Sequence, residues 1–225
     1  MNRILTIVIG ILTSLALAVP AHAATVKITD AVGDANAIND GIFLLSGCAI
    51  ILGNEVCVPT VPSRSTPVDA ASFDIKTVTV STVKKGGKPY AMNLTLELSA
   101  APAPAFAVYR VTGSLPQTPV TGVGGVELCS DVFFVEYYTL PLQNTSVRTC
   151  DPNDETDGYS NVTLPAAKVS GNKIIWTVPF TTLAARNIKI GAKLNGIGAH
   201  DRVATAVTYP QMDVVESTKT YTLGR

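Results

Sequence analysis

Oxygen-bearing side chains gather in one short loop near the start of the chain. Residues 30–40 read DAVGDANAIND, with three aspartates, Asp30, Asp34 and Asp40, and two asparagines, Asn36 and Asn39. Carboxylate and amide oxygens are the ligands that Ca²⁺ takes, about six to eight at a time. The same residue types also populate turns, because their side chains bond to the local backbone. The loop therefore predicts either a calcium site or an ordinary polar turn.

The spacing of these residues excludes an EF-hand, whose loop needs oxygen ligands at alternating positions. Counting from Asp30, the third position is Val32, and counting from Asp34, the fifth is Ile38. A second acidic segment, residues 151–157, fails the same test. We expect that segment to be a solvated turn, with a weak second cation site as the alternative.

The sequence lacks the side-chain combinations that common hydrolytic enzymes need. The only histidine after the leader segment is His200, and in an extended strand its side chain would diverge from that of its neighbour Asp201. No nucleophile-elbow, zinc-protease or phosphate-loop motif occurs. Asp131 and Glu136 could form a glycosidase pair, but one wet face of a strand explains them better. We therefore predict a protein without catalytic activity.

The first residues have the three parts of an export signal. Arg3 precedes an apolar run from Ile4 to Val19, and the sequence Ala21-His22-Ala23 matches the small-x-small pattern before a cleavage site. We expect a signal peptide at residues 1–23, a single domain at residues 24–225, no membrane span and a secreted, extracytoplasmic product.

Four cysteines follow the leader, Cys48, Cys57, Cys129 and Cys150. An exported chain meets an oxidising environment in which structural disulfides are the usual state. Four cysteines allow three pairings. Closeness in sequence favours Cys48 with Cys57 and Cys129 with Cys150.

Apolar and polar residues alternate through most of the chain, as in the segment AMNLTLEL at residues 91–98. Such alternation is typical of strands with one buried and one wet face. In FDIKTVTVSTV the apolar face shifts from Phe73 and Ile75 to Val78 and Val80, which predicts a β-bulge. Short strands separated by turn residues predict an all-β, antiparallel β-sandwich of jelly-roll or immunoglobulin-like type, with a β-barrel as the alternative.

Charge and surface features restrict the partners. The chain has 17 basic and 17 acidic residues and no basic stripe, so nucleic acid is not expected. Lysines 84, 85 and 88 lie in a turn and are expected to be solvated.

The segment DVFFVEYY places Phe134, Glu136 and Tyr138 on one face of a strand, where an uncovered apolar patch would bind a partner. Three sequons, at Asn93, Asn144 and Asn161, matter only in a host that glycosylates exported proteins.

The segments TDAVGDAN, VDAASFDIKTVTVS and LTLELSAAP, within residues 25–112, resemble a calcium-associated β-sandwich group. That group includes family 9 carbohydrate-binding modules and DOMON-like domains, and this chain is similar to exported bacterial members. The resemblance implies a structural Ca²⁺ held by Asp30, Asp34, Asn36 and Asp74. The insert at residues 43–67 departs from the group.

The resemblance does not identify a ligand. The single tryptophan, Trp176, alternates with Ile174 and Val178 and is expected in the core rather than on a sugar-binding face. Met92 also lies in a core pattern, which leaves few side chains for haem. The sequence thus predicts a secreted, non-catalytic binding or surface-interaction protein whose partner is an extracellular protein or a glycan. The alternative is a carbohydrate-binding accessory module or a carbohydrate-active enzyme.

Overall fold

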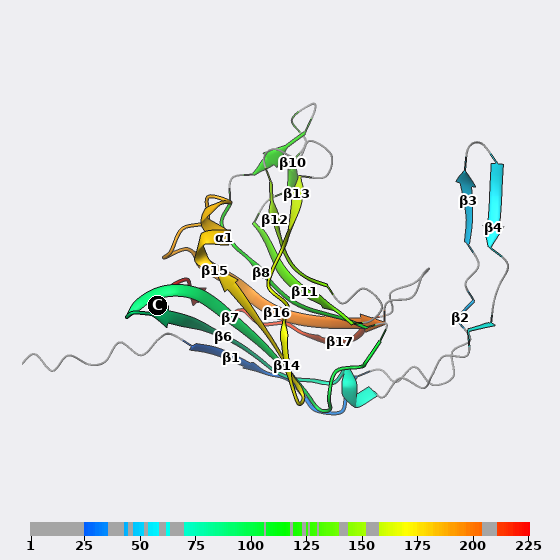
Figure 1. Cartoon of the computed structure of the whole chain (residues 1–225), viewed down its shortest axis with the longest axis horizontal. Coiled ribbons are helices and arrows are strands. Elements are labelled where there is room, and N and C mark those ends of the chain that lie inside the picture. Colours follow the sequence, from blue (N-terminus) through cyan, green and yellow to red (C-terminus); the bar gives the residue numbers. More distant parts are fainter. Residues whose placement is uncertain are drawn as a thin grey trace, which may run out of the picture.

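Most of the strands form two open antiparallel sheets that pack face to face, as the computed structural model shows (Figure 1), and three further pairs of short strands form two-stranded sheets. The predicted all-β sandwich is confirmed, and the sheets do not close into the alternative barrel. The residues that the structure describes are 25–35, 70–105, 107–117, 119–122, 125, 127–129, 131–139, 144–151, 158–203 and 211–225, with the backbone of four short strands between residues 43 and 63. The expected signal peptide at residues 1–23 lies outside this description.

The first sheet has five strands. In spatial order they are β1 (Thr25–Thr29), β6 (Ile75–Lys85), β7 (Lys88–Leu98), β15 (Lys173–Pro179) and β14 (Lys168–Ser170). The β6–β7 pairing shifts between Ile75 and Thr77, which confirms the predicted bulge. The bulge turns the start of β6, so that Asp74, one residue ahead of that strand, lies beside the loop that follows β1.

The second sheet has seven strands. Six lie in the order β13 (Tyr159–Thr163), β12 (Thr145–Cys150), β11 (Val132–Tyr138), β8 (Ala107–Ser114), β16 (Lys193–Val203) and β17 (Gln211–Val215), and β18 (Tyr221–Thr222) pairs with the first residues of β16. Gly198 in β16 has no room for a side chain, because a Cβ there would lie 2.7 Å from the carbonyl oxygen of Val215. This close approach brings β17 against β16 near the acidic residues described below.

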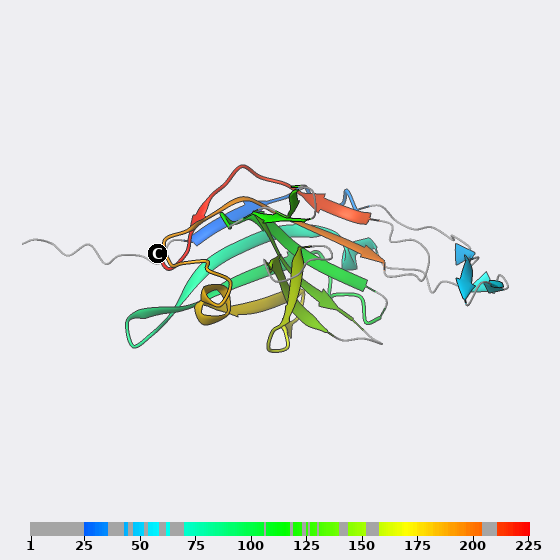
Figure 2. The ribbon, with the colours of Figure 1, turned by 90° about the horizontal axis from the view of Figure 1, so that it is seen from above.

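The hydrophobic core lies between the two sheets. Figure 2 shows the arrangement of the strands from above. Trp176 and Met92 are fully buried, as predicted, and the indole N–H of Trp176 donates to the backbone carbonyl of Glu136, 3.2 Å away. Phe73 stacks on Tyr109 at the end of the core nearest the loop after β1, with ring centroids 5.7 Å apart. The alternation in the sequence thus sorted most inward residues correctly.

The remaining elements are short. They are the strands β2 (Phe43–Leu44), β3 (Gly47–Ile51), β4 (Asn54–Val58), β5 (Pro62–Ser63), β9 (Val120–Thr121) and β10 (Glu127–Cys129), the 3₁₀ turn η1 (Ala70–Ser72) and the helix α1 (Phe180–Ala184). Within the described ranges no helix has the length and apolar character needed to cross a bilayer.

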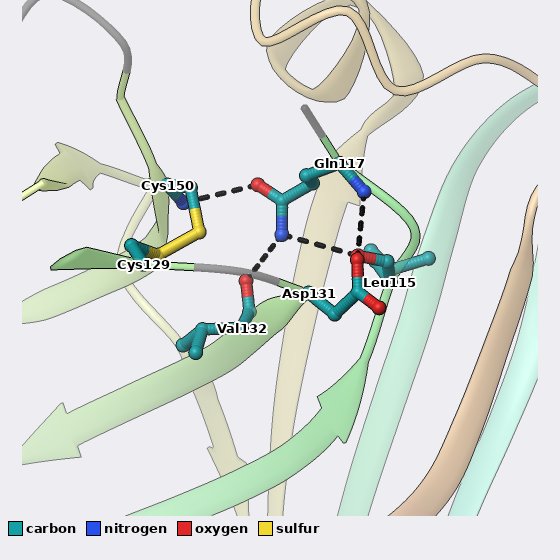
Figure 3. The surroundings of a disulfide bond; sticks show 6 residues. All are labelled: Leu115, Gln117, Cys129, Asp131, Val132 and Cys150. Atoms are coloured by element: carbon teal, nitrogen blue, oxygen red, sulfur yellow. Dashed lines mark hydrogen bonds between the residues drawn. A yellow bond between two sulfur atoms is a disulfide. The ribbon is translucent and has the colours of Figure 1, made fainter. Parts of the chain in front are cut away.

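Cys129 and Cys150 form a disulfide, as predicted, in a small apolar cluster beside the main core. Gln117 holds this corner together (Figure 3). Its side-chain oxygen accepts from the backbone N–H of Cys150 at 3.0 Å, and its amide group donates to the carbonyl of Val132 at 2.6 Å. In the β3–β4 hairpin the backbone of Cys48 lies opposite that of Cys57, as the predicted pairing requires. The side chains of that second pair lie outside the described part.

Candidate metal centre

The loop after β1 is anchored to the start of β6. The backbone N–H of Asp30 donates to the carbonyl of Lys76 at 3.0 Å, which extends the β1–β6 ladder by one residue. Gly33 then turns the chain with φ of +89°, a conformation that favours glycine. Its N–H donates to both carboxylate oxygens of Asp74, at 2.9 and 3.0 Å, and the hydroxyl of Ser99 donates to the same carboxylate. Asp74 therefore fixes the position of the loop.

A second carboxylate reaches this place from the other sheet. Asp213 lies in β17, points inward and is buried. One of its oxygens accepts from the backbone N–H of Ile75 at 2.7 Å, and the other accepts from the N–H of Val214 at 2.7 Å. Asp213 thus ties the start of β6 to an edge strand of the opposite sheet.

Three aspartates converge where these elements meet. Asp30, Asp34 and Asp213 each offer a carboxylate oxygen, and these three oxygens lie within 4.8 Å of one another. The second oxygen of Asp30 is buried and has no hydrogen-bond partner. The arrangement leaves acceptor oxygens of both sheets facing one small volume.

A fourth carboxylate, Asp201, lies directly across the ladder from Asp213. It is 0% exposed, and neither of its oxygens has a hydrogen-bond partner. Buried polar groups in proteins are nearly always hydrogen-bonded, so a buried carboxyl group with no partner requires an explanation. A bound cation or a retained proton would supply one.

The electrostatics of the cluster favour a cation or protons. Burial, together with the negative charges of Asp213 and Asp74, raises the pKa of Asp201 to about 9. The backbone N–H of Asp213 offsets part of this rise without completing a hydrogen bond. Burial also raises the pKa values of Asp30 and Asp213, and neighbouring aspartates add to both. Within the described residues, no ion pair joins any of these aspartates to a basic side chain.

The donor set fits a hard divalent cation. Every ligand atom on offer is a carboxylate oxygen, which is the preference of Ca²⁺ and Mg²⁺, and there is no histidine or thiolate in the cluster. An ion held by Asp30, Asp34 and Asp213 would neutralise the repulsion among them and connect the loop after β1 to β17. The role available to such an ion is structural, because it would lie where the two sheets meet.

The structure brings together two of the four residues expected as ligands. Asp30 and Asp34 share the cluster, Asp74 lies beside it as the anchor of the loop, and Asn36 falls outside the described residues. Sequence reasoning missed Asp213 and Asp201. The available signal was an aspartate in an inward position of an alternating strand, Asp201 two residues after the buried Ala199 and Asp213 two residues before the buried Val215.

The outer face of the seven-stranded sheet carries the expected surface residues. Phe134, Glu136 and Tyr138 lie on this face, while Phe133 and Val135 are in the core. Arginines cover the aromatic ring instead of leaving it as an open apolar patch. The guanidinium carbon of Arg110 lies 4.2 Å from the ring centroid of Phe134, and that of Arg148 lies 5.8 Å from it.

Two of the candidate catalytic residues, Glu136 and His200, lie in this same charged network. The Nε of Arg110 donates to Glu136 at 2.7 Å, and the hydroxyl of Tyr138 donates to the other oxygen of Glu136 at 3.3 Å. His200 faces outward from β16 opposite Arg110, while Asp201 faces the core, so the two side chains diverge as expected. Burial, Arg110 and Arg202 lower the pKa of His200 to about 4.

Asp131, the other member of the suggested glycosidase pair, has a local structural contact. It adopts a φ of +52°, and its carboxylate accepts from the backbone N–H of Gln117 at 3.0 Å. Asp151, at the start of the second acidic segment, is paired with Arg186. The rest of that segment, residues 152–157, lies outside the described ranges.

We compared the chain with protein-family models, with curated proteins and with solved structures, and found no match in any of the three.

Proposed function

We propose that this chain is an exported, non-catalytic β-sandwich binding protein stabilised by one structural Ca²⁺. The observation that supports this proposal best is the convergence of Asp30, Asp34 and Asp213, within 4.8 Å, beside the unpartnered buried carboxyl group of Asp201. The resemblance of residues 25–112 to calcium-associated β-sandwich domains agrees with this choice of ion.

The position of the cluster explains what the ion would do. Without it, the loop after β1 is held to β6 mainly through Asp74, and Asp213 is the link from β17 to the same place. An ion shared by Asp30, Asp34 and Asp213 adds a direct link between the sheets and relieves the repulsion among their carboxylates. Because the ion binds the folded state and not the unfolded chain, its binding energy adds to stability.

Asp34 offers a clean test of this proposal. Its side chain is exposed, so Asp34→Asn is not expected to disturb the metal-free fold. The experiment is calcium titration by calorimetry, with melting curves in Ca²⁺ and in chelator, on the chain without residues 1–23. We expect Ca²⁺ to raise Tm, and Asp34→Asn to weaken binding about tenfold or more, because the amide oxygen lacks the charge of the carboxylate.

The control is Glu216→Gln, which removes an exposed carboxylate near β17 that is not part of the cluster. It should leave both the affinity and the Tm shift unchanged. Equal melting temperatures in Ca²⁺ and in chelator for the unmodified chain would refute the calcium assignment. Equal affinity in Asp34→Asn would refute the ligand set.

For the binding role, we propose the outer face of the seven-stranded sheet, with Phe134, Glu136 and Tyr138 at its centre. Arg110 and Arg202 lie beside Glu136, and Arg148 lies over Phe134, so three cationic side chains share this face with one glutamate. This excess of positive charge favours a partner that carries carboxylate or other anionic groups. The alternative of a carbohydrate-binding module or enzyme has less support, because Trp176 is buried and offers no face for stacking on a sugar.

A further inference from the structure

Three separate segments meet at the end of the sandwich remote from the acidic cluster. They are the tip of the β6–β7 hairpin, the turn at residues 189–191 and the last residues of the chain. Gly224 lies against the first two, since a Cβ there would be 2.6 Å from Ile190 and 3.4 Å from Pro89. The N–H of Gly191 also donates to the carbonyl of Leu223 at 2.9 Å. We call this surface, formed by residues 84–90, 189–191 and 222–225, the basic end.

The basic end exposes two large apolar side chains. Ile190 is 55% exposed and Tyr90 is 46% exposed, and both are among the few large apolar residues left uncovered in the described part of the chain. Lys85 lies with its ammonium group 5.7 Å from the centre of the Tyr90 ring. Figure 1 shows the C-terminus beside the tip of the β6–β7 hairpin.

The charged side chains of the basic end are all cationic. Its exposed cationic side chains are Lys84, Lys85, Lys88, Lys189 and Arg225, and Lys193 follows close by in β16. The segments 82–92, 187–193 and 221–225 contain no aspartate or glutamate. Lysines in a turn are ordinarily solvated, but here Lys85 lies against the ring of Tyr90, and in the described part of the chain no ion pair joins these lysines to an acid.

We propose that the basic end docks on a membrane surface of anionic phospholipid. Lysine and arginine near such a surface are attracted to its headgroups, and apolar side chains among them enter the boundary with the acyl chains. Tyrosine suits this depth because its ring is apolar and its hydroxyl stays hydrated. A soluble acidic protein would satisfy the charges but would leave Ile190 without a similar environment.

The position of the first strand agrees with a sandwich whose basic end faces the membrane. Thr25, the first residue of β1, pairs with Ser81, in the half of β6 that leads to the hairpin tip. The apolar run Ile4–Val19 ends six residues before Thr25, a distance that an extended chain spans in about 20 Å. A leader held in the membrane at Ile4–Val19, as the export signal predicts, would keep the basic end of the sandwich towards the lipid.

This inference is independent of the metal centre. The acidic cluster lies at the start of β6 and the basic end at the other end of the same strand, which is 11 residues or about 35 Å long. Loss of calcium binding and loss of lipid binding can therefore be measured separately.

The experiment is co-sedimentation of the chain, without residues 1–23, with vesicles of neutral phosphatidylcholine or of phosphatidylcholine with about 30% phosphatidylglycerol. It is run at low and high NaCl, in Ca²⁺ and in chelator. The test variant is Lys88→Gln/Lys189→Gln. The matched control is Lys27→Gln/Lys168→Gln, which removes two exposed lysines elsewhere. A second variant, Ile190→Ser, removes the apolar group without changing the charge.

We expect binding to the anionic vesicles only, weakened by salt and present with or without Ca²⁺. The test variant should lose about 30-fold in affinity, about fivefold for each lysine, and the control variant should bind as the unmodified chain does. Ile190→Ser should lose about tenfold. In Tyr90→Trp the new tryptophan should shift its emission to the blue on anionic vesicles, against the constant signal of the buried Trp176.

Four results would overturn the proposal. The first is no binding to anionic vesicles at low salt. The second is an equal loss in the test and control variants, which would show that only net charge matters. The third is tight binding to a soluble polyanion without binding to vesicles, which would make the partner an acidic polymer. Binding that requires Ca²⁺ would assign the interaction to the acidic cluster and likewise exclude the basic end.

Discussion

The substitution Asp201→Asn should change the stability of the fold in opposite directions with and without calcium. In the metal-free protein the pKa of Asp201 is raised to about 9, whereas in the unfolded chain it is about 3.9. The folded state therefore keeps a proton that the unfolded state loses between these values. The free energy of unfolding has its full value below about pH 3.9, where Asp201 is protonated in both states. It falls by about 1.4 kcal/mol per pH unit as the pH rises towards 9.

At pH 7 this difference amounts to about 4 kcal/mol against the folded state. Asparagine does not ionise, so Asp201→Asn removes that penalty while keeping the shape of the side chain. It still buries an amide group, which reduces the gain. We therefore expect the metal-free variant to be more stable than the unmodified chain by about 1–3 kcal/mol, which for about 200 residues is an increase in Tm of several degrees.

With Ca²⁺ bound, the sign should reverse. A divalent cation at Asp30, Asp34 and Asp213 would lower the pKa of the adjacent Asp201 and favour its ionised form. The neutral amide then gives up that attraction, so the variant should bind calcium more weakly and melt below the unmodified protein in Ca²⁺. The assay is urea unfolding at pH 4 and pH 7, each in Ca²⁺ and in chelator.

The control is Glu216→Gln, an exposed substitution that should stay within about 0.5 kcal/mol under all four conditions. The reasoning fails if Asp201→Asn destabilises the protein equally in Ca²⁺ and in chelator at pH 7. It also fails if the gain in chelator persists undiminished at pH 4, where the penalty should have nearly vanished.

Three further predictions test other parts of the structure. Ser99→Ala removes one donor to the Asp74 carboxylate and should cost about 1–2 kcal/mol of unfolding free energy, measured by urea unfolding, with a loss below about 0.5 kcal/mol counting against the anchor. His200, the single histidine of the chain without residues 1–23, should titrate with a pKa of about 4 by proton NMR. Because this pKa is depressed, His200 should reduce stability as the pH falls from about 6.5 towards 4, and a titration near pH 6.5 would contradict the buried setting. Replacing both Cys129 and Cys150 by alanine should cost about 3 kcal/mol for the closed loop of 21 residues, and an unchanged Tm would show that the bridge does not constrain the unfolded chain.

The sequence predicts the fold well because its signals are local. Strict alternation in residues 91–98 and the shifted alternation at residues 73–80 report directly on which side chains point inward. The structure confirms both the strand and the bulge. The disulfide between Cys129 and Cys150 followed from closeness in sequence, because a hairpin brings its own ends together.

The candidate site was only half accessible to the same reasoning. Asp30 and Asp34 belong to one loop, so their closeness in sequence is enough to group them. Asp213 reaches Ile75 across 138 residues, and its position depends on which strand pairs with β16. Strand order is a property of the whole chain and leaves no mark in a short segment. An aspartate in an inward position was the one local anomaly that could have directed attention to this place.

The large sequence separation between the proposed calcium ligands also predicts how calcium should affect the rates of folding and unfolding. The ion would connect the loop after β1 to β17, near opposite ends of the chain, so both sheets must be largely formed before its ligands assemble. Contacts between segments far apart in sequence close the largest loops, and we expect these to form after the transition state. A contact that is absent from the transition state changes the rate of unfolding, whereas the rate of folding stays the same.

Calcium at about 100 times its Kd stabilises the folded state by about 2.7 kcal/mol. If that energy is absent from the transition state, unfolding should slow about 100-fold, while the folding rate measured after dilution from urea should change less than about twofold. Stopped-flow measurements over a range of urea concentrations, in Ca²⁺ and in chelator, separate the two rates. If calcium instead accelerated folding and left unfolding unchanged, the ion would have to bind before the sheets meet. The loop after β1 would then have to form a site without Asp213, which the convergence of ligands from both sheets argues against.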